Sequence, residues 1–254
     1  MEPYYLAYEH RHNAVHAAGV SRWGHADDDP GLVAALTDWV QANDLRGKRV
    51  VEFMCGEGAS GVILSQLGCD YTGVDVSPAA VRAARESLSR HPNARAMVCD
   101  AAQSALRSAL RSAMRPAVDG GFDGALDVMG LHMLVADPDR AQYLRNAFSC
   151  LKPGAPMLFF RESHRANAYE GPVASFEDWL ALTGDDYATP QPRTAHGRDG
   201  EVEVLIALLP ARARTLTGYA AELQATGFVV ERAEALPEND ECPLSAAIWA
   251  RKPR

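Results

Sequence analysis

The sequence predicts an α/β fold, a doubly wound, Rossmann-like sheet of seven strands with helices on both faces. Three observations support this. Short apolar, β-branched runs alternate along the chain with segments of helical spacing. A glycine-rich turn, Gly56-Glu57-Gly58, follows the first of these runs. The chain has 254 residues, 47% of them hydrophobic, which is enough for one domain with a substantial core. Strands separated by helices form βαβ units, and such units build a parallel sheet.

The elements of the first half follow from apolar runs and capping signals. The strand over 48–54 begins after Gly47 and ends at the glycine-rich turn. Ser77 and Pro78 start a helix, because serine caps helix N-termini and proline fits the first helical turn. In order, the sequence predicts a helix over 31–42, the strand 48–54, a helix over 58–67, a strand over 71–76, the helix 78–88 and a strand over 96–99.

The second half continues this alternation and then departs from it. A helix over 140–151 ends at the turn Lys152-Pro153-Gly154. Residues 161–203 contain prolines and glycines where the next helix should be, and Asp199-Gly200 predicts a hairpin there. The remaining predicted elements are strands over 125–128 and 156–160, a helix over 219–226, and strands over 227–230 and 246–250.

Charge and composition exclude several partners. With 25 Lys plus Arg against 33 Asp plus Glu, the net charge of −8 would repel a phosphate backbone, so we expect no nucleic acid. No apolar run of about 18 residues and no N-terminal basic segment followed by an apolar core is present, so we expect no membrane partner and a cytoplasmic protein. The five cysteines form no Cys-x-x-Cys pair, which argues against a disulfide framework or a cysteine zinc site.

The glycine-rich turn is compatible with more than one cofactor. Residues 56–61 have the spacing G-x-G-x-x-G, and Asp75 ends the next strand, as in proteins that bind dinucleotides. An NAD-dependent oxidoreductase would share both features. Two observations favour a different cofactor. Glu52 lies inside the end of the preceding strand, and the chain closes with Gly227-Phe228 and a strand pair in place of a second mononucleotide half.

Five segments, in order, resemble the motifs of the class I S-adenosylmethionine-dependent methyltransferase family, of the small-molecule type. They are residues 50–58, 72–77, 98–101, 122–127 and 151–154, and the resemblance covers residues 45–160 and the closing segment that begins at 227. The chain departs from the family pattern at one position. Met54 stands where the family usually has the first glycine of its first motif, and its side chain needs room there.

The resemblance implies S-adenosylmethionine as the cofactor. Gly56 and Gly58 would let the backbone approach it, Asp75 would bind the ribose diol, and Asp100 with the Ala101 backbone would read the adenine edge. Asp75 could instead only cap the helix that follows, and for Glu52 the structural and functional interpretations are equally open. The residues expected to bind the cofactor are Tyr8, Trp23, Glu52, Met54, Cys55, Gly56, Gly58, Asp75, Val76, Asp100, Ala101 and Asp127.

The implied domain organisation is a single methyltransferase domain over 1–254. Residues 1–44 would form an N-terminal cover, 45–160 the cofactor-binding core, 161–215 a substrate lid inserted after the fifth strand, and 216–254 a closing helix and strand pair. Long insertions in such folds are usually lids. The acidic excess of this one favours a cationic acceptor, although a solvated acidic surface explains the excess equally well.

Methyl transfer is an in-line displacement that needs a base only when the acceptor atom carries a proton. The candidates are His132 after the fourth strand, His164 after the fifth and His196 on the expected hairpin, each of which could instead be structural. The implied partner is a small-molecule acceptor with a nitrogen or oxygen nucleophile, and the protein would be a monomer or homodimer. A catalytically inactive module that binds an adenosyl ligand is the remaining alternative. His12 and His16 have the spacing of a two-histidine metal site but lack a His-Glu-x-x-His motif, so no metal is assigned.

Overall fold

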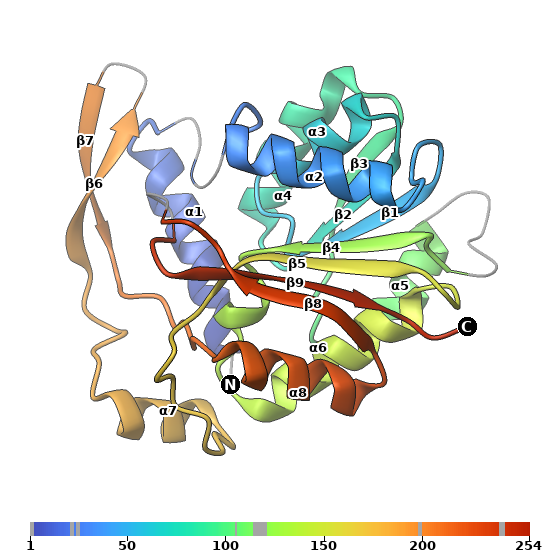
Figure 1. Cartoon of the computed structure of the whole chain (residues 1–254). Helices are drawn as coiled ribbons and strands as arrows, with labels where there is room; N and C mark the ends of the chain where they lie inside the picture. Colours follow the sequence, from blue (N-terminus) through green and yellow to red (C-terminus); the bar gives the residue numbers. More distant parts are fainter. Residues whose placement is uncertain are drawn as a thin grey trace.

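The computed structural model describes residues 3–20, 23, 26–104, 106–113, 121–197, 200–238 and 242–254. A central sheet of seven strands lies between two layers of helices, and a two-stranded hairpin stands apart from it (Figure 1). The strand order is β3-β2-β1-β4-β5-β9-β8. The pairs from β3 to β5 are parallel, whereas β9 runs antiparallel to both of its neighbours. The predicted doubly wound α/β fold is confirmed.

The sheet strands occupy the segments where the sequence predicts them, with ends that differ by a few residues. They are β1 (Arg49–Phe53), β2 (Asp70–Asp75), β3 (Ala94–Val98), β4 (Gly124–Val128), β5 (Pro156–Ser163), β8 (Val229–Ala235) and β9 (Ser245–Arg251). Strand β4 is buried along its whole length and β1 at four of its five residues, as expected for parallel strands covered on both faces.

Helices α2, α3 and α4 cover one face of the sheet, and α5, α6 and α8 cover the other (Figure 1). The predicted cap of α4 forms, since the Ser77 hydroxyl accepts the N–H of Ala80 at 2.9 Å and Pro78 occupies the first turn. The helices that cover the sheet are α2 (Pro30–Ala42), α3 (Ala59–Gln66), α4 (Pro78–Ser87), α5 (Leu106–Ala113), α6 (Asp137–Cys150) and α8 (Leu216–Thr226), with short 3₁₀ turns η2 (Leu88–Arg90) and η3 (Leu131–Met133).

The N-terminal residues form a further helix across the carboxyl-terminal edge of the sheet. The turn η1 (Tyr4–Leu6) leads into α1 (Ala7–Ala17). Glu9 holds α1 to the start of α4, because its carboxylate accepts the Ser77 hydroxyl and the N–H of Ala79 at 3.0 Å. The Tyr8 hydroxyl donates to the carbonyl of Pro210 at 2.8 Å, so the helix is held from two sides.

Strand β5 extends three residues beyond its predicted end at 160. A bulge opposite β9, between Phe159 and Glu162, places Arg161 in the left-handed region with φ 58°. The extension carries Glu162 into the space beneath η3, where it is fully buried. A strand that ended at residue 160 would not place the Glu162 side chain there.

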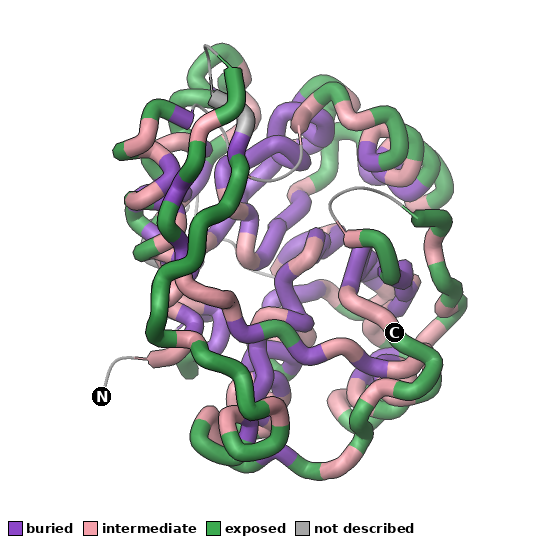
Figure 2. The backbone as a smooth tube through the Cα atoms, turned by 90° about the vertical axis from the view of Figure 1, so that its left-hand side faces the viewer, coloured by how far each residue is buried: buried purple, intermediate pink, exposed green. Residues whose placement is uncertain are grey.

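The insertion after β5 contains a helix, α7 (Phe176–Thr183), and the hairpin strands β6 (Gln191–Gly197) and β7 (Gly200–Ile206). The predicted hairpin is present, although its expected turn residue Asp199 lies outside the described residues. The hairpin packs on the outer side of α1, where Val15 and Val20 meet Val204 and Ile206. Figure 2 shows that exposed residues predominate along this insertion, whereas the central strands β1, β4 and β5 are largely buried. The insertion therefore supports the cover helix from outside.

A buried ion pair joins α8 to α6. The side chain of Arg140 is 1% exposed, and its Nε and Nη2 donate to the Glu222 carboxylate at 2.6 and 2.7 Å. Its Nη1 also donates to the carbonyl oxygens of Leu131 and Leu134, both at 2.8 Å. One guanidinium therefore connects both helices to the loop after β4.

Within the described part of the chain, no helix combines the length and the apolar character that crossing a bilayer requires.

Candidate functional site

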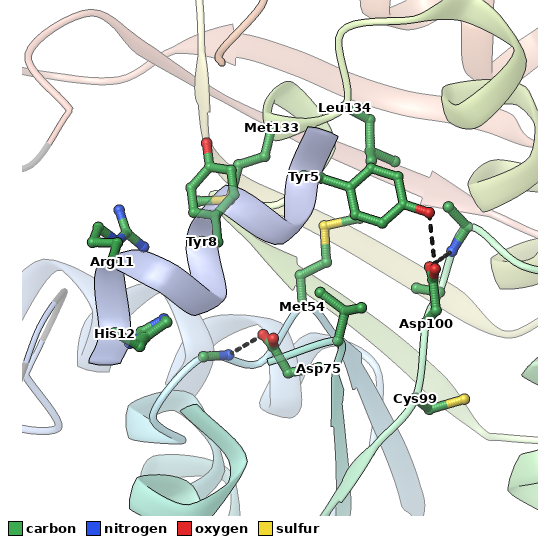
Figure 3. Close-up of a pocket in the computed structure, with 14 residues that line it drawn as sticks. Tyr5, Tyr8, Arg11, His12, Met54, Asp75, Cys99, Asp100, Met133 and Leu134 are labelled. Atoms are coloured by element: carbon green, nitrogen blue, oxygen red, sulfur yellow. Dashed lines mark hydrogen bonds between the residues drawn. The ribbon is translucent and has the colours of Figure 1, made fainter. Parts of the chain in front are cut away.

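A pocket lies at the carboxyl-terminal ends of β1, β2 and β3, beneath η1 and α1 (Figure 3). It encloses about 590 Å³ of empty space, including solvent at its mouth. In open α/β sheets, ligands bind at this edge of the strands. The pocket is lined by Tyr5, Tyr8, Arg11, His12, Met54, Gly56, Asp75, Val76, Cys99, Asp100, Ala101, Ala102, Met133 and Leu134.

Seven residues expected to bind the cofactor come together in this pocket, namely Tyr8, Met54, Gly56, Asp75, Val76, Asp100 and Ala101. Three others, Trp23, Cys55 and Gly58, belong to segments next to the pocket but do not line it, among the residues that the structure describes. The sequence reasoning left Tyr5 and Arg11 out of the cofactor set, and both line the pocket.

The glycine-rich turn brings the backbone of β1 to the floor of the pocket. Gly56 and Gly58 have φ values of 51° and 84°, which glycine adopts without strain. A Cβ atom at Gly58 would lie 3.1 Å from the Cβ of Ala84, so the absence of a side chain lets α3 and α4 approach closely. The turn thus combines an open ligand face with tight packing behind it.

Asp75 ends β2 and faces the pocket, where its two oxygens hold adjacent segments in place. Oδ2 accepts the N–H of Gly56 at 2.9 Å, the bond drawn at Asp75 in Figure 3. Oδ1 accepts the N–H of Ser77 at 2.8 Å. Burial raises the pKa of the Asp75 carboxyl, and the two N–H donors oppose that shift. Asp75 therefore both accepts a backbone N–H just before α4 and lines the pocket.

Asp100 follows β3 and is held by two donors. Its Oδ1 accepts the N–H of Ala102 and its Oδ2 accepts the Tyr5 hydroxyl, both at 2.8 Å. Burial and the hydrogen bond to Asp100 raise the pKa of Tyr5, so the phenol remains a donor at neutral pH. Since Tyr5 belongs to η1, this bond joins the N-terminal cover to the pocket wall.

Met54 has a left-handed backbone conformation, which glycine adopts more readily than other residues. Its φ of 55° is left-handed, a region that costs an ordinary L-residue about 1–2 kcal/mol. The side chain lies in the middle of the pocket, between Tyr5 and Asp75 (Figure 3). Met54 therefore occupies space that a glycine would leave open.

Arg11 places a cationic side chain at one end of the pocket. Its guanidinium carbon lies 4.8 Å from the ring centroid of Tyr8 and 5.5 Å from that of Trp23. Burial lowers its pKa, and Asp75 opposes this shift. Within the described part of the chain, its buried Nε has no hydrogen-bond acceptor. A buried donor in this position suits an anionic oxygen of a ligand.

The acids Glu52 and Asp127 lie beneath the pocket, and neither lines it in the described structure. Glu52 accepts the Tyr71 hydroxyl, and burial raises its pKa to about 8, so the carboxyl is largely protonated at pH 7. Asp127 accepts the Tyr143 hydroxyl and the N–H of Gly130, and burial beside another acid raises its pKa well above the usual range. The expectation that both residues bind the cofactor stays a prediction.

The raised pKa of Glu52 predicts a pH-dependent stability difference. An acid with a raised folded-state pKa stabilises the fold fully below its unfolded pKa, and this contribution is lost as the pH rises through the folded value of about 8. Glu52→Gln, which is neutral at every pH, should match the wild type at pH 5 and exceed its unfolding free energy by at least about 1 kcal/mol at pH 9. Denaturant unfolding at both pH values tests this. The exposed Glu86→Gln is the control, and a difference that is independent of pH would contradict the prediction.

His132 is buried beside Glu162, a residue that the sequence reasoning missed. Its Nδ1 lies 2.9 Å from Oε2 of Glu162, which also accepts the backbone N–H of His132 at 2.8 Å. Oε1 of Glu162 accepts the N–H of Gly130 at 3.2 Å. The Ser163 N–H also lies 3.3 Å from Nδ1. When Nδ1 carries the proton and donates it to the Glu162 carboxylate, Nε2 is left as the proton acceptor.

Neither His132 nor His164 is among the described residues that line the pocket, although Met133 and Leu134, which follow His132 in the chain, are. His164 places its Nδ1 3.0 Å from the carbonyl oxygen of Arg214. His196 belongs to β6, but its side chain lies outside the described part of the structure. Among the described residues, the pocket lining also includes no residue of the predicted lid, 161–215.

Comparison of the sequence with known proteins finds methyltransferases. A family described as "Methyltransferase domain" matches residues 50–154. The chain is 36% identical over 167 residues to the ribosomal protein L11 methyltransferase of Aeromonas hydrophila, covering 61% of this chain and 54% of that protein. The chain spans between 25% and 54% of the length of the first curated relatives that it matches.

Solved structures show the same fold at low sequence identity. The 1,6-didemethyltoxoflavin-N1-methyltransferase of Burkholderia thailandensis, with bound 1,6-didemethyltoxoflavin and S-adenosylhomocysteine, aligns with a TM-score of 0.62 at 16% identity, over 99% of this chain and 89% of that one. An S-adenosylmethionine-dependent methyltransferase from Clostridium acetobutylicum aligns with a TM-score of 0.61 at 11% identity, over 98% and 99% of the two chains.

Proposed function

Because this chain belongs to the class I S-adenosylmethionine-dependent methyltransferases, we propose that it transfers a methyl group from S-adenosylmethionine to a small-molecule acceptor. The observation that carries this proposal is the pocket under α1, where the glycine-rich turn, Asp75 and Asp100 converge at adjacent strand ends.

The residues of the pocket suit the parts of this cofactor. The Asp75 carboxylate can accept the two hydroxyl groups of a ribose, and Asp100 with the backbone at Ala101 can bind the edge of an adenine. At the opposite end, Arg11 has a buried Nε that suits the carboxylate of the methionine part. The pocket therefore offers acceptors for the ribose and the adenine at one end and a cation for the carboxylate at the other.

Two observations support an acceptor of small size. The pocket lies beneath the roof of η1 and α1 and not on an open face, as sites for small molecules usually do. The structure from Burkholderia thailandensis that aligns over 99% of this chain contains a small heterocycle, whereas the L11 methyltransferase of Aeromonas hydrophila matches 61% of it. The acidic insertion adds no argument for a cationic acceptor, because no described residue of it lines the pocket.

The cofactor supplies an activated methyl group, so the protein has to align the acceptor, exclude water and, for a protonated nucleophile, remove a proton. The apolar side chains of Met54, Met133 and Leu134 keep the pocket dry where the methyl group would lie. His132, with Glu162 on its Nδ1, is our proposed base for acceptors that carry a proton on nitrogen or oxygen.

Calorimetric titration with S-adenosylhomocysteine, beside NAD, tests the cofactor without the acceptor. We expect saturable binding of one S-adenosylhomocysteine per chain and no binding of NAD. Binding of NAD alone would support an oxidoreductase and overturn the proposal. Binding of S-adenosylhomocysteine without methyl transfer from S-adenosylmethionine to any amine or hydroxyl compound in a broad screen would support an inactive binding module.

Asp75→Ala is expected to weaken binding of S-adenosylhomocysteine by about 1.5–3 kcal/mol, the usual loss for hydrogen bonds to a charged group. Asp70→Ala is the matched control, because Asp70 begins the same strand at the opposite edge of the sheet. Calorimetry measures both affinities, and circular dichroism checks that both variants fold. An unchanged affinity in Asp75→Ala would refute the role of this residue in binding the ribose.

A further inference from the structure

Two imidazoles of α1 and one carboxylate of the glycine-rich turn meet above the pocket, and we call them the His12–His16–Glu57 cluster. Oε1 of Glu57 lies 3.0 Å from Nδ1 of His12 and 3.0 Å from Nε2 of His16. All three ligand atoms lie within 4.8 Å of one another. The carboxylate comes from a segment 41 residues away in sequence from His16, so the fold creates this arrangement.

We propose that the His12–His16–Glu57 cluster binds one divalent transition-metal ion of the zinc type. Two histidines and one carboxylate form a recurrent protein ligand set for zinc, with a fourth position left for water or another ligand. In an α-helix, residues four apart present their side chains on the same face, which lets both imidazoles bind one ion.

The two nitrogen-to-oxygen distances are compatible with a shared ion. Zinc binds histidine nitrogen and carboxylate oxygen at about 2.0–2.2 Å, which places two ligand atoms of one ion about 3–3.5 Å apart. The observed distances of 3.0 Å lie at the lower end of this range. The His16 side chain is 31% exposed, so it is the ligand with the most freedom to adjust to an ion.

The surroundings of the cluster also fit a cation. The Trp23 N–H donates to Oε2 of Glu57 at 2.9 Å and leaves Oε1 directed at the two rings, the type of outer contact that orients metal ligands. Among the described residues, the carboxylates of Glu57 and Asp75 lie close enough to Arg11 to oppose its positive charge.

The cluster is open to solvent on one side and adjoins the pocket on the other. His12 and Glu57 are buried, with side chains 6% and 7% exposed, whereas His16 is partly open to solvent and provides a route for the ion. Glu57 lies between two glycines of the turn, and His12 lines the pocket. A bound ion would therefore join the cover helix α1 to the turn beside the pocket.

The test is metal binding by the full chain after treatment with a chelator. Zn²⁺ is titrated in competition with a chromophoric chelator, and Co²⁺ reports coordination through its visible absorption. We expect one Zn²⁺ per chain, a Co²⁺ spectrum of a four- or five-coordinate site with nitrogen ligands, and a thermal midpoint that rises with Zn²⁺. His16→Gln and Glu57→Gln should each weaken Zn²⁺ binding by about 100-fold or more.

The matched control is His10→Gln, which removes an exposed imidazole of α1 outside the cluster and should retain full Zn²⁺ affinity. Because His16 is partly exposed, His16→Gln should fold even if Glu57→Gln does not. The proposal is overturned if the wild type binds no Zn²⁺ in stoichiometric amount, or if His16→Gln binds it as tightly as His10→Gln. Neither S-adenosylmethionine nor an acceptor is needed, so this result is independent of the proposed methyl transfer.

Discussion

Arg140→Ala is expected to lower the free energy of unfolding by about 3–5 kcal/mol, the cost of removing one partner from a buried ion pair. The Glu222 carboxylate would lose both of its short contacts with Arg140. The carbonyl oxygens of Leu131 and Leu134 would lose their shared donor as well. Each of these acceptors would then be buried without its donor, whereas in the unfolded chain it is hydrogen-bonded to water.

Urea unfolding of the wild type and the variant measures this effect. Arg145→Ala is the control, because Arg145 lies on the same helix with an exposed side chain and should change stability by less than about 0.5 kcal/mol. The double variant Arg140→Met with Glu222→Leu should recover much of the loss, since it removes both charges together. A loss below about 1 kcal/mol in Arg140→Ala would contradict the importance of this pair.

His132→Ala should reduce turnover by about 100-fold or more on an acceptor whose nucleophile carries a proton, because the step would lose its base. Glu162→Gln should produce a smaller loss in kcat with little change in KM, since the glutamine orients the imidazole without stabilising its charge. Initial rates on the acceptor found by screening measure both effects.

His164→Ala is the matched control for this experiment, because the Nδ1 of His164 contacts a backbone carbonyl away from the pocket. It should keep a turnover near that of the wild type. A near-normal rate in His132→Ala, with S-adenosylhomocysteine affinity unchanged, would return His132 to a structural role in the loop after β4.

The sheet could be predicted from the sequence because its signals are local. An apolar strand such as β1, a cap such as Ser77 with Pro78, and a turn such as 56–58 each depend on neighbouring residues. The same holds for Asp75 and Asp100, which follow strand ends and therefore meet at one edge. For this reason the part of the pocket formed by the sheet was accessible to sequence reasoning.

The residues that were missed depend on contacts over long sequence distances. Glu162 reaches His132 through an extended strand with a bulge, which no local pattern in 156–163 indicates. The His12–His16–Glu57 cluster is another example. The spacing of His12 and His16 can be recognised in the sequence, but Glu57 joins them only because α1 packs against the glycine-rich turn.

Helix α7 was different, because its signal was present in the sequence. Ser175 and Asp178 form a capping box at its start, but the prolines around this segment outweighed that pattern. From the sequence we predict no helix in this part of the insertion, and the structure has one over residues 176–183.

The way the cover helix is held has a consequence for the order of folding during synthesis. Tyr8 of α1 donates to the carbonyl of Pro210, a contact that spans 202 residues. Its other anchors, Ser77 at the start of α4 and Val204 of the hairpin, also follow it along the chain. A ribosome therefore releases α1 first, yet this helix has to wait for nearly the whole polypeptide before all its partners exist. The pocket is consequently completed only after Pro210 has been synthesised, and a nascent chain that ends after β5 has α1 without its anchors at Pro210 and Val204.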